Sequence, residues 1–479
     1  MSACGTVFPM TREREPASSF AQEHFGAADL GHKKRNACLL RVAEKICRHP
    51  GGTLPNKLAH PADYKAMDGL MNRPEVTHAS VLAPHVRRTQ EQMRAAAGVV
   101  LLLHDTTELD YSGLSIAELG PIGNGGGRGY LCHNTLAVTP ERREVLGLAH
   151  QILHRRVPVP PGEGVKAKRQ RASRESRLWS RAVLALGPAP AGVQWVDVAD
   201  RGADLFEFLA TEHQLGRTCV VRACHNRSIR VGHGGDGEQA LLFDYLRSLP
   251  AAGQQSKKVF DRHLAAEREV KLAVAFAAVA LQPPHVKKGE YPNRPLPIWG
   301  LRIWEPNPPK GKKPLQWYVL SNEAVTTLAQ AWQKSSWYEC RYVVEEFHKA
   351  KKTGCTIEKL QFETEQALQP MIALLSVVAV LLLNLREACR QPDAATRPAT
   401  EVVDTQYEEI LRAWRYHNPR AAMTVKEFYL ALARLGGHMN RKCDGNPGWL
   451  VLWRGWTKLQ SMLDGAEAER RRQKICRET

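Results

Sequence analysis

Four side chains with phosphate-binding and metal-binding chemistry lie close together near residue 340. They are Tyr338, Arg341, Glu345 and Lys352, within the run WYECRYVVEEFHKAKK from Trp337 to Lys352. If this run is one helix, these residues and Lys349 fall at i, i+3, i+7, i+11 and i+14, which is one continuous stripe. The cations suit phosphates and the single acid suits a metal ion. A solvated helix face of ion pairs is the plainer alternative.

An apolar stripe runs beside this charged stripe. It consists of Trp337, Cys340, Val344 and Phe347. An amphipathic helix buries such a stripe and presents the other one outward. The pattern therefore predicts a helix that packs on a core and directs its charged residues toward a ligand.

Two aspartates follow apolar runs that read as buried strands. Asp105 follows Val99–Leu103, and Asp200 follows Val193–Val198. An aspartate at a strand end is commonly only a cap or turn residue. Two-metal phosphoryl transfer, however, needs carboxylates from separate segments. Because Glu345 would supply a third carboxylate, the pattern favours a metal-dependent site. Other acids nearby compete for the role, namely Asp110, Asp197, Asp204 and Glu346.

The elements that would position these carboxylates follow a recognisable order. Strands are expected at Val99–Leu103, Tyr130–Val138 and Val145–Leu153, which should pair antiparallel because turns join them. A strand (Val193–Val198), a helix (Leu205–His213) and a strand (Arg217–Arg222) come next, followed by the helix that bears Glu345. This is the order of a ribonuclease-H-like α/β fold. Further strands at Val270–Leu281, Ile298–Trp304 and Trp317–Leu320 predict an inserted β-sheet.

Helices are expected on both sides of this α/β region. Ahead of it they cover Ala37–Arg48, Pro61–Leu70 and Val76–Met93, and after it Glu363–Arg390 and a tail from Thr405 to Arg471. The apolar run Met371–Leu385 is shorter than a bilayer span, so a buried helix is expected.

Composition points to a polyanionic partner. The chain has 479 residues, a formal net charge of +18 and a hydrophobic fraction of 43%. Such a charge favours nucleic acid first and an anionic membrane surface second. The first twenty residues lack an apolar segment of the secretory type, which predicts a cytoplasmic protein. The eleven cysteines form no CxxC pair, so neither a zinc site nor a disulfide framework is expected.

The spacing Tyr-x2-Arg-x3-Glu-x6-Lys matches the signature of one group of bacterial DDE transposases. The chain resembles the hairpin-forming, cut-and-paste transposases of insertion-sequence family four, most closely the transposon-five type, from about Phe25 to Gly465. The block HDTTELDY contains Asp105, and ADRGADLFEFL contains Asp200. The resemblance implies a helical DNA-binding domain at 1–90, a ribonuclease-H-like catalytic domain at 91–390 with a β insertion at about 225–335, and a helical dimerisation domain at 391–479.

The resemblance also implies roles for individual residues. Asp105 would bridge two Mg²⁺ ions, replaceable by Mn²⁺, while Asp200 completes one metal site and Glu345 the other. Tyr338, Arg341, Lys349, Lys352 and Arg222 would hold DNA phosphates near the cleavage site. Trp317, in PLQWYVLSNE, would stack on a base flipped from the DNA; without the resemblance it reads as a core residue. Lys33, Lys34 and Arg35, just ahead of the first helix, and Arg48 at its end are expected to contact DNA.

The partners implied are double-stranded DNA, at element ends and target, and a second copy of the chain. The aromatic tail with Trp449, Trp453 and Trp456 is the candidate for that second contact. Neither a membrane nor a small-molecule substrate is expected. Cys38 and the pair Arg48-His49 depart from the pattern of close relatives, so the recognised end sequence should differ. A structure-specific DNA nuclease and a repressor that binds element ends without cutting are the alternatives.

Overall fold

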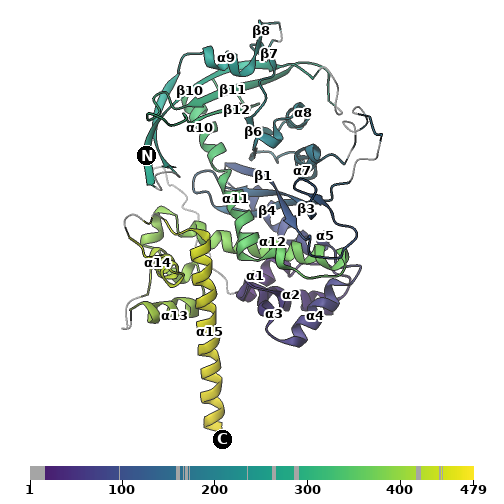
Figure 1. Cartoon of the computed structure of the whole chain (residues 1–479), viewed down its shortest axis with the longest axis vertical. Coiled ribbons are helices and arrows are strands. Elements are labelled where there is room, and N and C mark those ends of the chain that lie inside the picture. The colour runs from purple at the N-terminus through teal and green to yellow at the C-terminus, as the bar shows by residue number, and fades with distance from the viewer. Residues whose placement is uncertain are drawn as a thin grey trace, which may run out of the picture. The chain divides into compact units, whose positions relative to one another are not determined.

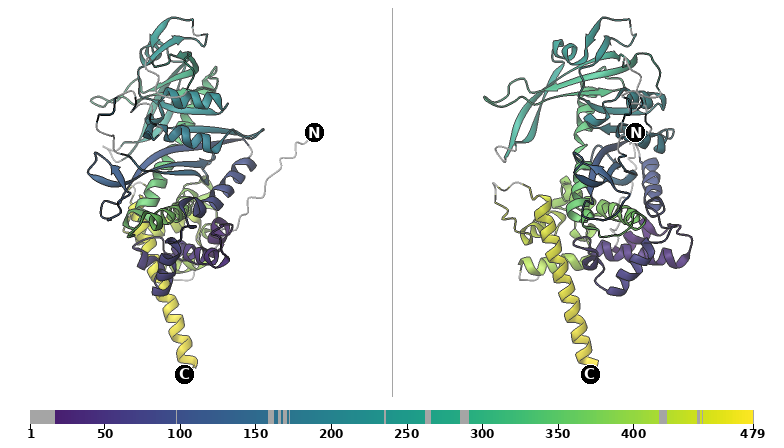
Figure 2. Two further views of the ribbon diagram at one scale, coloured as in Figure 1. Left: turned by 90° about the vertical axis from the view of Figure 1, so that its right-hand side faces the viewer. Right: turned by 45° about the vertical axis from the view of Figure 1, so that its right-hand side comes forward.

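The computed structural model describes residues 17–478, apart from 97, 158–161, 165–166, 168–170, 172, 235, 262–265, 285–290, 417–421, 442–443 and 445. It divides into two compact units. The helical unit comprises Met1–Pro84, Ala350–Leu360 and Gln369–Thr479, and the sheet unit comprises His85–Lys349 and Gln361–Leu368. Figure 1 labels the elements, and Figure 2 gives two further views. The three-domain division expected from the sequence stays a prediction.

One mixed sheet of twelve strands dominates the sheet unit. The strand order is β2-β3-β1-β5-β6-β12-β11-β10-β7-β8, with β4 paired to β3 and β9 paired to β10. The strands are β1 (Val99–Asp110), β2 (Gly120–Ile122), β3 (Gly127–Val138), β4 (Val145–His154), β5 (Gln194–Ala199), β6 (Thr218–Ala223), β7 (Ser228–Val231), β8 (Gln239–Leu241), β9 (Gly253–Asp261), β10 (Ala266–Leu281), β11 (Leu296–Trp304) and β12 (Gln316–Ser321).

The predicted pairing of the first strands is confirmed. β1 pairs antiparallel with β3, β3 pairs antiparallel with β4, and β5 lies parallel to both β1 and β6. The short strand β2 was not predicted. One prediction about Asp105 is wrong: β1 does not end at Leu103 but continues to Asp110, because pairing with β3 persists as far as Asp110 and Gly129. Asp105 therefore lies within a strand.

The three strands expected between residues 225 and 335 are also confirmed, as β10, β11 and β12. They extend the same sheet, because β12 pairs antiparallel with β6 through Ser321 and Val220 at one end and Tyr318 and Ala223 at the other. The long β9 and β10 strands pair with one another in the half of the sheet away from β3, and their teal ribbons extend from it in Figure 2.

Helices cover both faces of the sheet. Helices α7 (Leu178–Leu186), α8 (Phe206–Gln214) and α9 (Leu242–Ser248) share one apolar core with Ala199, Val221 and Leu320. On the other face, α10 (Leu328–Glu339) contacts β5, β6 and β12, and α11 (Tyr342–Lys349) contacts β1 and β3. One face of the sheet therefore packs against α7, α8 and α9, and the other face packs against α10 and α11, the helix that bears Glu345.

The expectation of one uninterrupted helix from Trp337 to Lys352 is wrong. The chain turns at Cys340 and Arg341, where the amide of Arg341 bonds the carbonyl of Tyr338 and the amide of Val343 bonds that of Cys340. These are bonds across three residues, which tighten the backbone relative to an α-helix. From Ala350 to Gly354 the chain is a π-helix instead. The apolar stripe is nevertheless buried as predicted, at Trp337, Cys340, Val344 and Phe347.

The helical unit contains helices at both ends of the chain, as expected. They are α1 (Ala17–Phe25), α2 (Lys33–Arg48), α3 (Leu54–Leu58), α4 (Pro61–Met71), α13 (Thr405–Tyr416), α14 (Val425–Leu435) and α15 (Trp449–Glu478), of which α1 and α3 were not predicted. Two further helices, α5 (His78–Ala95) and α12 (Glu365–Ala388), have residues in both units. The expected start of the first long helix at Ala37 is wrong. Helix α2 begins at Lys33 because His32 caps it, its Nδ1 accepting from the amide of Lys34 at 3.1 Å.

Helix α12 is long and apolar enough to cross a membrane by length and composition alone. In the structure, 78% of its most apolar window is buried inside the protein. This burial is what a core helix shows, as the sequence predicted.

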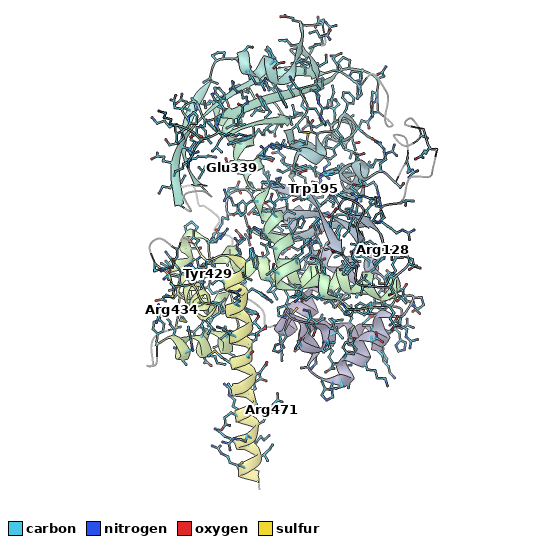
Figure 3. The ribbon with its side chains drawn as sticks, viewed as in Figure 1. Arg128, Trp195, Glu339, Tyr429, Arg434 and Arg471 are labelled. Carbon is cyan, nitrogen blue, oxygen red and sulfur yellow. The ribbon has the colours of Figure 1, made fainter. Side chains whose placement is uncertain are left out.

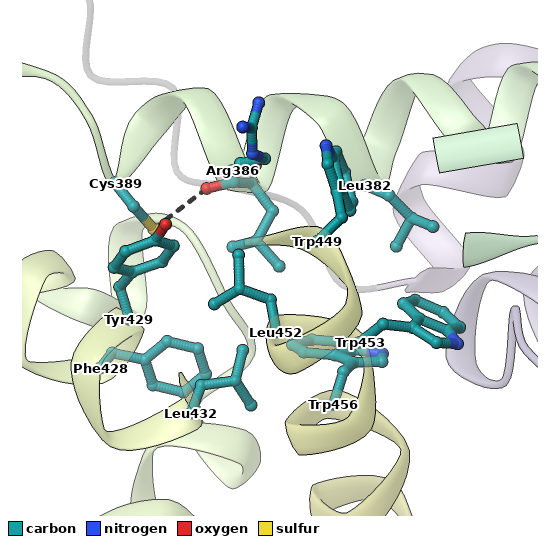
Figure 4. Close-up of a pocket in the computed structure, with 11 residues that line it drawn as sticks. Leu382, Arg386, Cys389, Phe428, Tyr429, Leu432, Trp449, Leu452, Trp453 and Trp456 are labelled. Carbon is teal, nitrogen blue, oxygen red and sulfur yellow. Dashed lines mark hydrogen bonds between the residues drawn. The ribbon is translucent and has the colours of Figure 1, made fainter. Parts of the chain in front are cut away.

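The aromatic tail packs within the helical unit. Figure 4 shows Trp456 of α15 near Leu432 of α14 and Trp449 beside Arg386 of α12. Trp456 is 8% exposed and stacks on Tyr407 with the ring centres 4.9 Å apart. The expectation that these tryptophans contact a second copy is therefore wrong for Trp456, because its ring is already buried.

A buried lysine joins two segments of the helical unit that are far apart in sequence. The Lys57 ammonium donates to the carbonyl of Pro50 at 2.6 Å, to that of Gly52 at 2.8 Å and to the hydroxyl of Thr356 at 3.0 Å. Burial lowers the pKa of Lys57 to about 8 from its ordinary 10.5. Its neutral partners satisfy its donors but leave its charge uncompensated.

This lysine predicts a local pH dependence of stability. An unfolded Lys57 holds its proton up to about pH 10.5, whereas the folded one loses it near pH 8. The free energy of unfolding should therefore rise as pH increases from 8, because the unfolded state binds more protons there. Urea unfolding of wild type and Lys57→Met between pH 7 and 10 measures this. As pH rises, the free energy of unfolding of wild type should increase relative to that of Lys57→Met. A difference between the two free energies that does not change with pH would contradict the lowered pKa of Lys57.

Candidate active site

A row of polar side chains crosses the sheet on the face that α11 covers. Asp105 is paired in register with Asn134 on β3, which is paired with Gln151 on β4. On the other side, His104 pairs with Ala199 and Ala199 with Val221, so the next residues, Asp105, Asp200 and Arg222, share one level. Because residues at matched register point to the same face, these side chains form one row, which we call the polar row.

Arg341 joins two of the three predicted carboxylates. Its Nη1 lies 3.2 Å from Oδ2 of Asp105, and its Nη2 donates to Oε1 of Glu345. Burial lowers the pKa of Arg341, but the charges of Asp105 and Glu345 more than offset this, so its pKa is raised. The turn at Cys340 and Arg341 thus places one guanidinium between an acid of the sheet and an acid of α11.

The third carboxylate lies within electrostatic reach. Burial raises the pKa of Asp105 to about 6; Arg341 and the amide of Thr106 oppose this shift, while the charges of Asp200 and Glu345 add to it. Asp200 caps the short turn that follows β5, its Oδ1 accepting from the amide of Gly202 at 2.9 Å. Asp105, Asp200 and Glu345 therefore form one acidic cluster with Arg341 as the cation in contact with it.

This cluster fits a hard divalent cation. Its ligand atoms are carboxylate oxygens, which Mg²⁺ and Mn²⁺ prefer. Desolvation and mutual repulsion destabilise the charge on Asp105, and a bound divalent cation would reverse both effects. The side chain of Glu345 is 47% exposed, so the cluster is open to solvent.

The acids that competed in the sequence have other partners. Asp197 is fully buried with Arg217, Asp204 pairs with Arg227, Glu346 pairs with Lys349, and Asp110 accepts from Ser112. Asp204 also lies near Cys224 and His225 in a group with metal-ligand atoms. Its Oδ2 accepts from the amides of both residues, at 2.7 and 3.0 Å, and its Oδ1 is held by Arg227, so this carboxylate is already saturated.

The predicted phosphate-binding residues fall into two groups. In the sheet unit, Tyr338 lies near Arg341, Arg222 is half-buried in the polar row, and Lys349 is 55% exposed beside Glu346. Lys352 belongs instead to the helical unit, where its Nζ lies 2.9 Å from Glu358.

Trp317 lies on the same face of the sheet as Arg222. Arg222 pairs with Val319, and Trp317 is two residues away on that strand. Its ring is half-buried, and its Nε1 is buried with no hydrogen-bond partner. The indole is thus neither a fully buried core residue nor a free surface residue.

The four cations predicted near the first long helix differ in exposure. Lys33 and Lys34 are exposed and lie in the first turn of α2, not ahead of it. Arg35 is engaged locally, since its Nη1 donates to the carbonyl of Leu30 at 2.8 Å and lies 2.9 Å from Glu75. Arg48 is 53% exposed and pairs with Glu44 at 2.7 Å.

The structure adds three residues that the sequence gave no reason to select: His348, Asn134 and Gln151. His348 follows Glu345 by one helical turn, and its Nδ1 lies 3.9 Å from Oδ2 of Asp105. Asn134 and Gln151 belong to the polar row and bond one another at 2.7 Å. Only strand register could have revealed Asn134 and Gln151, because these two residues are far from the motif in sequence.

Comparison with known proteins finds a similarity for the N-terminal helices. Residues 17–76 match the family described as transposase DNA-binding. Helices α1 to α4 are therefore similar to the DNA-binding part of transposases, which supports DNA as the partner of this segment. A solved structure, the cryo-EM structure of a piggyBac transposase synaptic complex with hairpin DNA, is 12% identical, with a TM-score of 0.30, over 81% of this chain and 70% of that one. A TM-score this low does not establish a shared fold.

Proposed function

We propose that this chain is a metal-dependent DDE transposase of the insertion-sequence family four type, whose Tyr-x2-Arg-x3-Glu-x6-Lys (YREK) signature is Tyr338, Arg341, Glu345 and Lys352. The observation that carries the proposal is that Arg341 contacts both Asp105 and Glu345, while the charge of Asp200 acts on Asp105 from the end of β5. The match of residues 17–76 to transposase DNA-binding segments supports it independently. The order β4-β3-β1-β5-β6, with α11 on one face, supports a ribonuclease-H-like core for these strands.

The acidic cluster would hold two Mg²⁺ ions, for which Mn²⁺ would substitute. When bound, these ions supply the charge that activates an attacking oxygen and stabilises a leaving oxygen. Asp105, Asp200 and Glu345 would hold these ions, because the charges of Asp200 and Glu345 both act on Asp105. Arg341 offsets part of the negative charge of the cluster and would turn its guanidinium to a DNA phosphate, which it can grip with two parallel hydrogen bonds.

The reaction would consist of successive phosphoryl displacements. Water first attacks a phosphodiester at the element end, forming a P–O bond as the bond to the 3′ oxygen breaks. The freed 3′-hydroxyl attacks a phosphorus of the opposite strand, forming a hairpin as the bond to the 3′ oxygen of the flanking DNA breaks. Water then attacks the hairpin phosphorus and releases the 3′-hydroxyl again, and this hydroxyl attacks a target phosphorus as the bond to a 3′ oxygen of the target breaks. Arg222, Tyr338, Lys349 and Lys352 would hold phosphates during these steps.

Hairpin formation requires a base to leave the stacked DNA helix, and the flipped base would stack on the indole ring of Trp317. Stacking a base on an aromatic ring returns about 1–3 kcal/mol, which offsets much of the cost of extrusion. Its position on the face that carries Arg222 and the acidic cluster supports this role. In this proposal two copies of the chain bind the two element ends in the bacterial cytoplasm, where Lys33, Lys34 and Arg48 contact DNA.

Two other functions share parts of this site. A structure-specific nuclease would use the same carboxylates without attack by a 3′-hydroxyl, and a repressor would use only the DNA-binding helices. The intact cluster of three acids favours an enzyme over the repressor.

The products formed on DNA decide between them. The purified chain is incubated with Mg²⁺ and linear DNA that carries the sequence flanking its own gene, and the strands are resolved on a denaturing gel. The transposase predicts nicks followed by hairpins. Nicks that never proceed to hairpins would indicate the nuclease, and bound but uncut DNA would indicate the repressor.

A further inference from the structure

One histidine beside the acidic cluster is held in a defined orientation. His348 lies on α11, and its side chain is 12% exposed. Its Nε2 lies 3.1 Å from Nδ2 of Asn134, and its Nδ1 lies 3.9 Å from Oδ2 of Asp105. The ring therefore stands between an amide of the polar row and a carboxylate of the acidic cluster.

The orientation of the Asn134 amide is fixed by the backbone. Its Nδ2 lies 2.9 Å from the carbonyl oxygen of Cys132, which can only accept a hydrogen bond. A flipped amide would place two oxygens against each other. Gln151 reinforces this orientation by donating to Oδ1 of Asn134 at 2.7 Å. Asn134 is therefore a donor toward His348.

This orientation selects one form of the imidazole. A nitrogen that accepts from Asn134 carries no hydrogen, so in the neutral ring the hydrogen is on Nδ1. That hydrogen points toward Asp105. A separation of 3.9 Å is longer than a hydrogen bond, but catalytic hydrogen bonds are often long before substrate binds and tighten in the complex.

Among the described residues, two other groups donate to the Asp105 carboxylate. Its Oδ1 accepts from the amide of Thr106 at 2.9 Å, and its Oδ2 faces Arg341 at 3.2 Å. If Arg341 turns to a phosphate, as the proposed function requires, Oδ2 loses that contact. His348 then remains as the donor on this side.

We propose that Asn134 holds His348 with its hydrogen on Nδ1, and that His348 is thereby a positioning residue that orients Asp105 for metal binding. This inference rests on the proposed metal-dependent function. It adds to that function three residues, His348, Asn134 and Gln151, that would orient the Asp105 carboxylate without contacting the metal. Partners of metal ligands typically change metal affinity by roughly 10- to 100-fold when removed.

The tautomer is tested by nuclear magnetic resonance on the full chain labelled with ¹⁵N-histidine. At a pH where histidines are neutral, the His348 signals, assigned by their loss in His348→Asn, should show a protonated Nδ1 and an unprotonated Nε2. Asn134→Ala should convert them to a mixture of both tautomers. A wild-type ring protonated on Nε2 would overturn the inference.

Metal binding is tested by calorimetric titration of Mn²⁺ into the same full-length proteins. His348→Ala should weaken binding by roughly 10-fold or more, whereas His348→Asn, whose amide nitrogen can replace Nδ1, should recover most of the loss. His213→Ala, an exposed histidine on α8, is the matched control and should bind like wild type.

The result separates the inference from the proposed function. Unchanged Mn²⁺ binding in a folded His348→Ala protein would overturn the positioning role even if wild type cleaves DNA. Failure of wild type to cleave DNA would instead reject the transposase, while tautomer and Mn²⁺ affinity still decide the role of His348.

Discussion

Glu345→Gln should bind element-end DNA as wild type does and yield no cleaved strand, a loss of at least roughly 10³-fold in nicking rate. Glutamine keeps the shape of the side chain but removes the charge that would hold a divalent cation. It also leaves Arg341 with Asp105 as its remaining acidic partner in the cluster. The measurement is single-turnover nicking of labelled DNA, with binding followed separately by gel shift.

A matched substitution shows whether the loss is specific. Glu118 is an exposed glutamate in the same sheet unit, outside the acidic cluster, so Glu118→Gln should nick DNA at the wild-type rate. If Glu345→Gln also retained more than about a tenth of that rate, Glu345 would not be a metal ligand, since losing one costs far more.

Arg217→Met should lower the free energy of unfolding by about 3–5 kcal/mol, because it leaves a buried carboxylate without its main counter-charge. Asp197 and Arg217 are both fully buried, and Nε of Arg217 donates to Oδ2 of Asp197 at 2.7 Å. Burial raises the pKa of Asp197, but Arg217 and His104 outweigh this and hold it below its ordinary value. The guanidinium also lies 5.6 Å from the ring centre of Trp195, which Figure 3 labels.

The network containing this pair lies behind the candidate site. Nε2 of His104 lies 2.7 Å from Oδ1 of Asp197, and His104 precedes Asp105 on β1. Urea unfolding of Arg217→Met and of the double variant Arg217→Met/Asp197→Leu tests the energetics. The double variant should recover part of the loss, because an apolar pair avoids the uncompensated charge. A single-variant loss below about 1 kcal/mol would show that the ion pair contributes no more than a surface pair.

Much of the sheet could be predicted because burial on both faces leaves a continuous apolar run. Val99–Leu103 and Val193–Val198 are such runs, and both are parallel strands. The polar end of β1, from Thr106 to Asp110, has no such signature, and only its pairing with β3 keeps it in the sheet. Sequence therefore placed Asp105 at the end of a strand, whereas it lies within β1.

The helix that bears Glu345 shows a different limit. Residue spacing identified the buried stripe and the charged residues, but it assumed unbroken α-helical geometry. The turn at Arg341 changes only a few backbone hydrogen bonds, which periodicity does not encode, yet it sets where the guanidinium reaches. His348 was missed for a related reason: its orientation depends on Asn134, a residue 214 positions away.

The most direct test of the central claim is anomalous diffraction from crystals of the full chain with element-end DNA and Mn²⁺. Two Mn²⁺ ions per active site should appear, with Asp105 ligating both, Asp200 one and Glu345 the other. Mn²⁺ located away from these carboxylates while the same crystals accumulate cleaved DNA would contradict the claim.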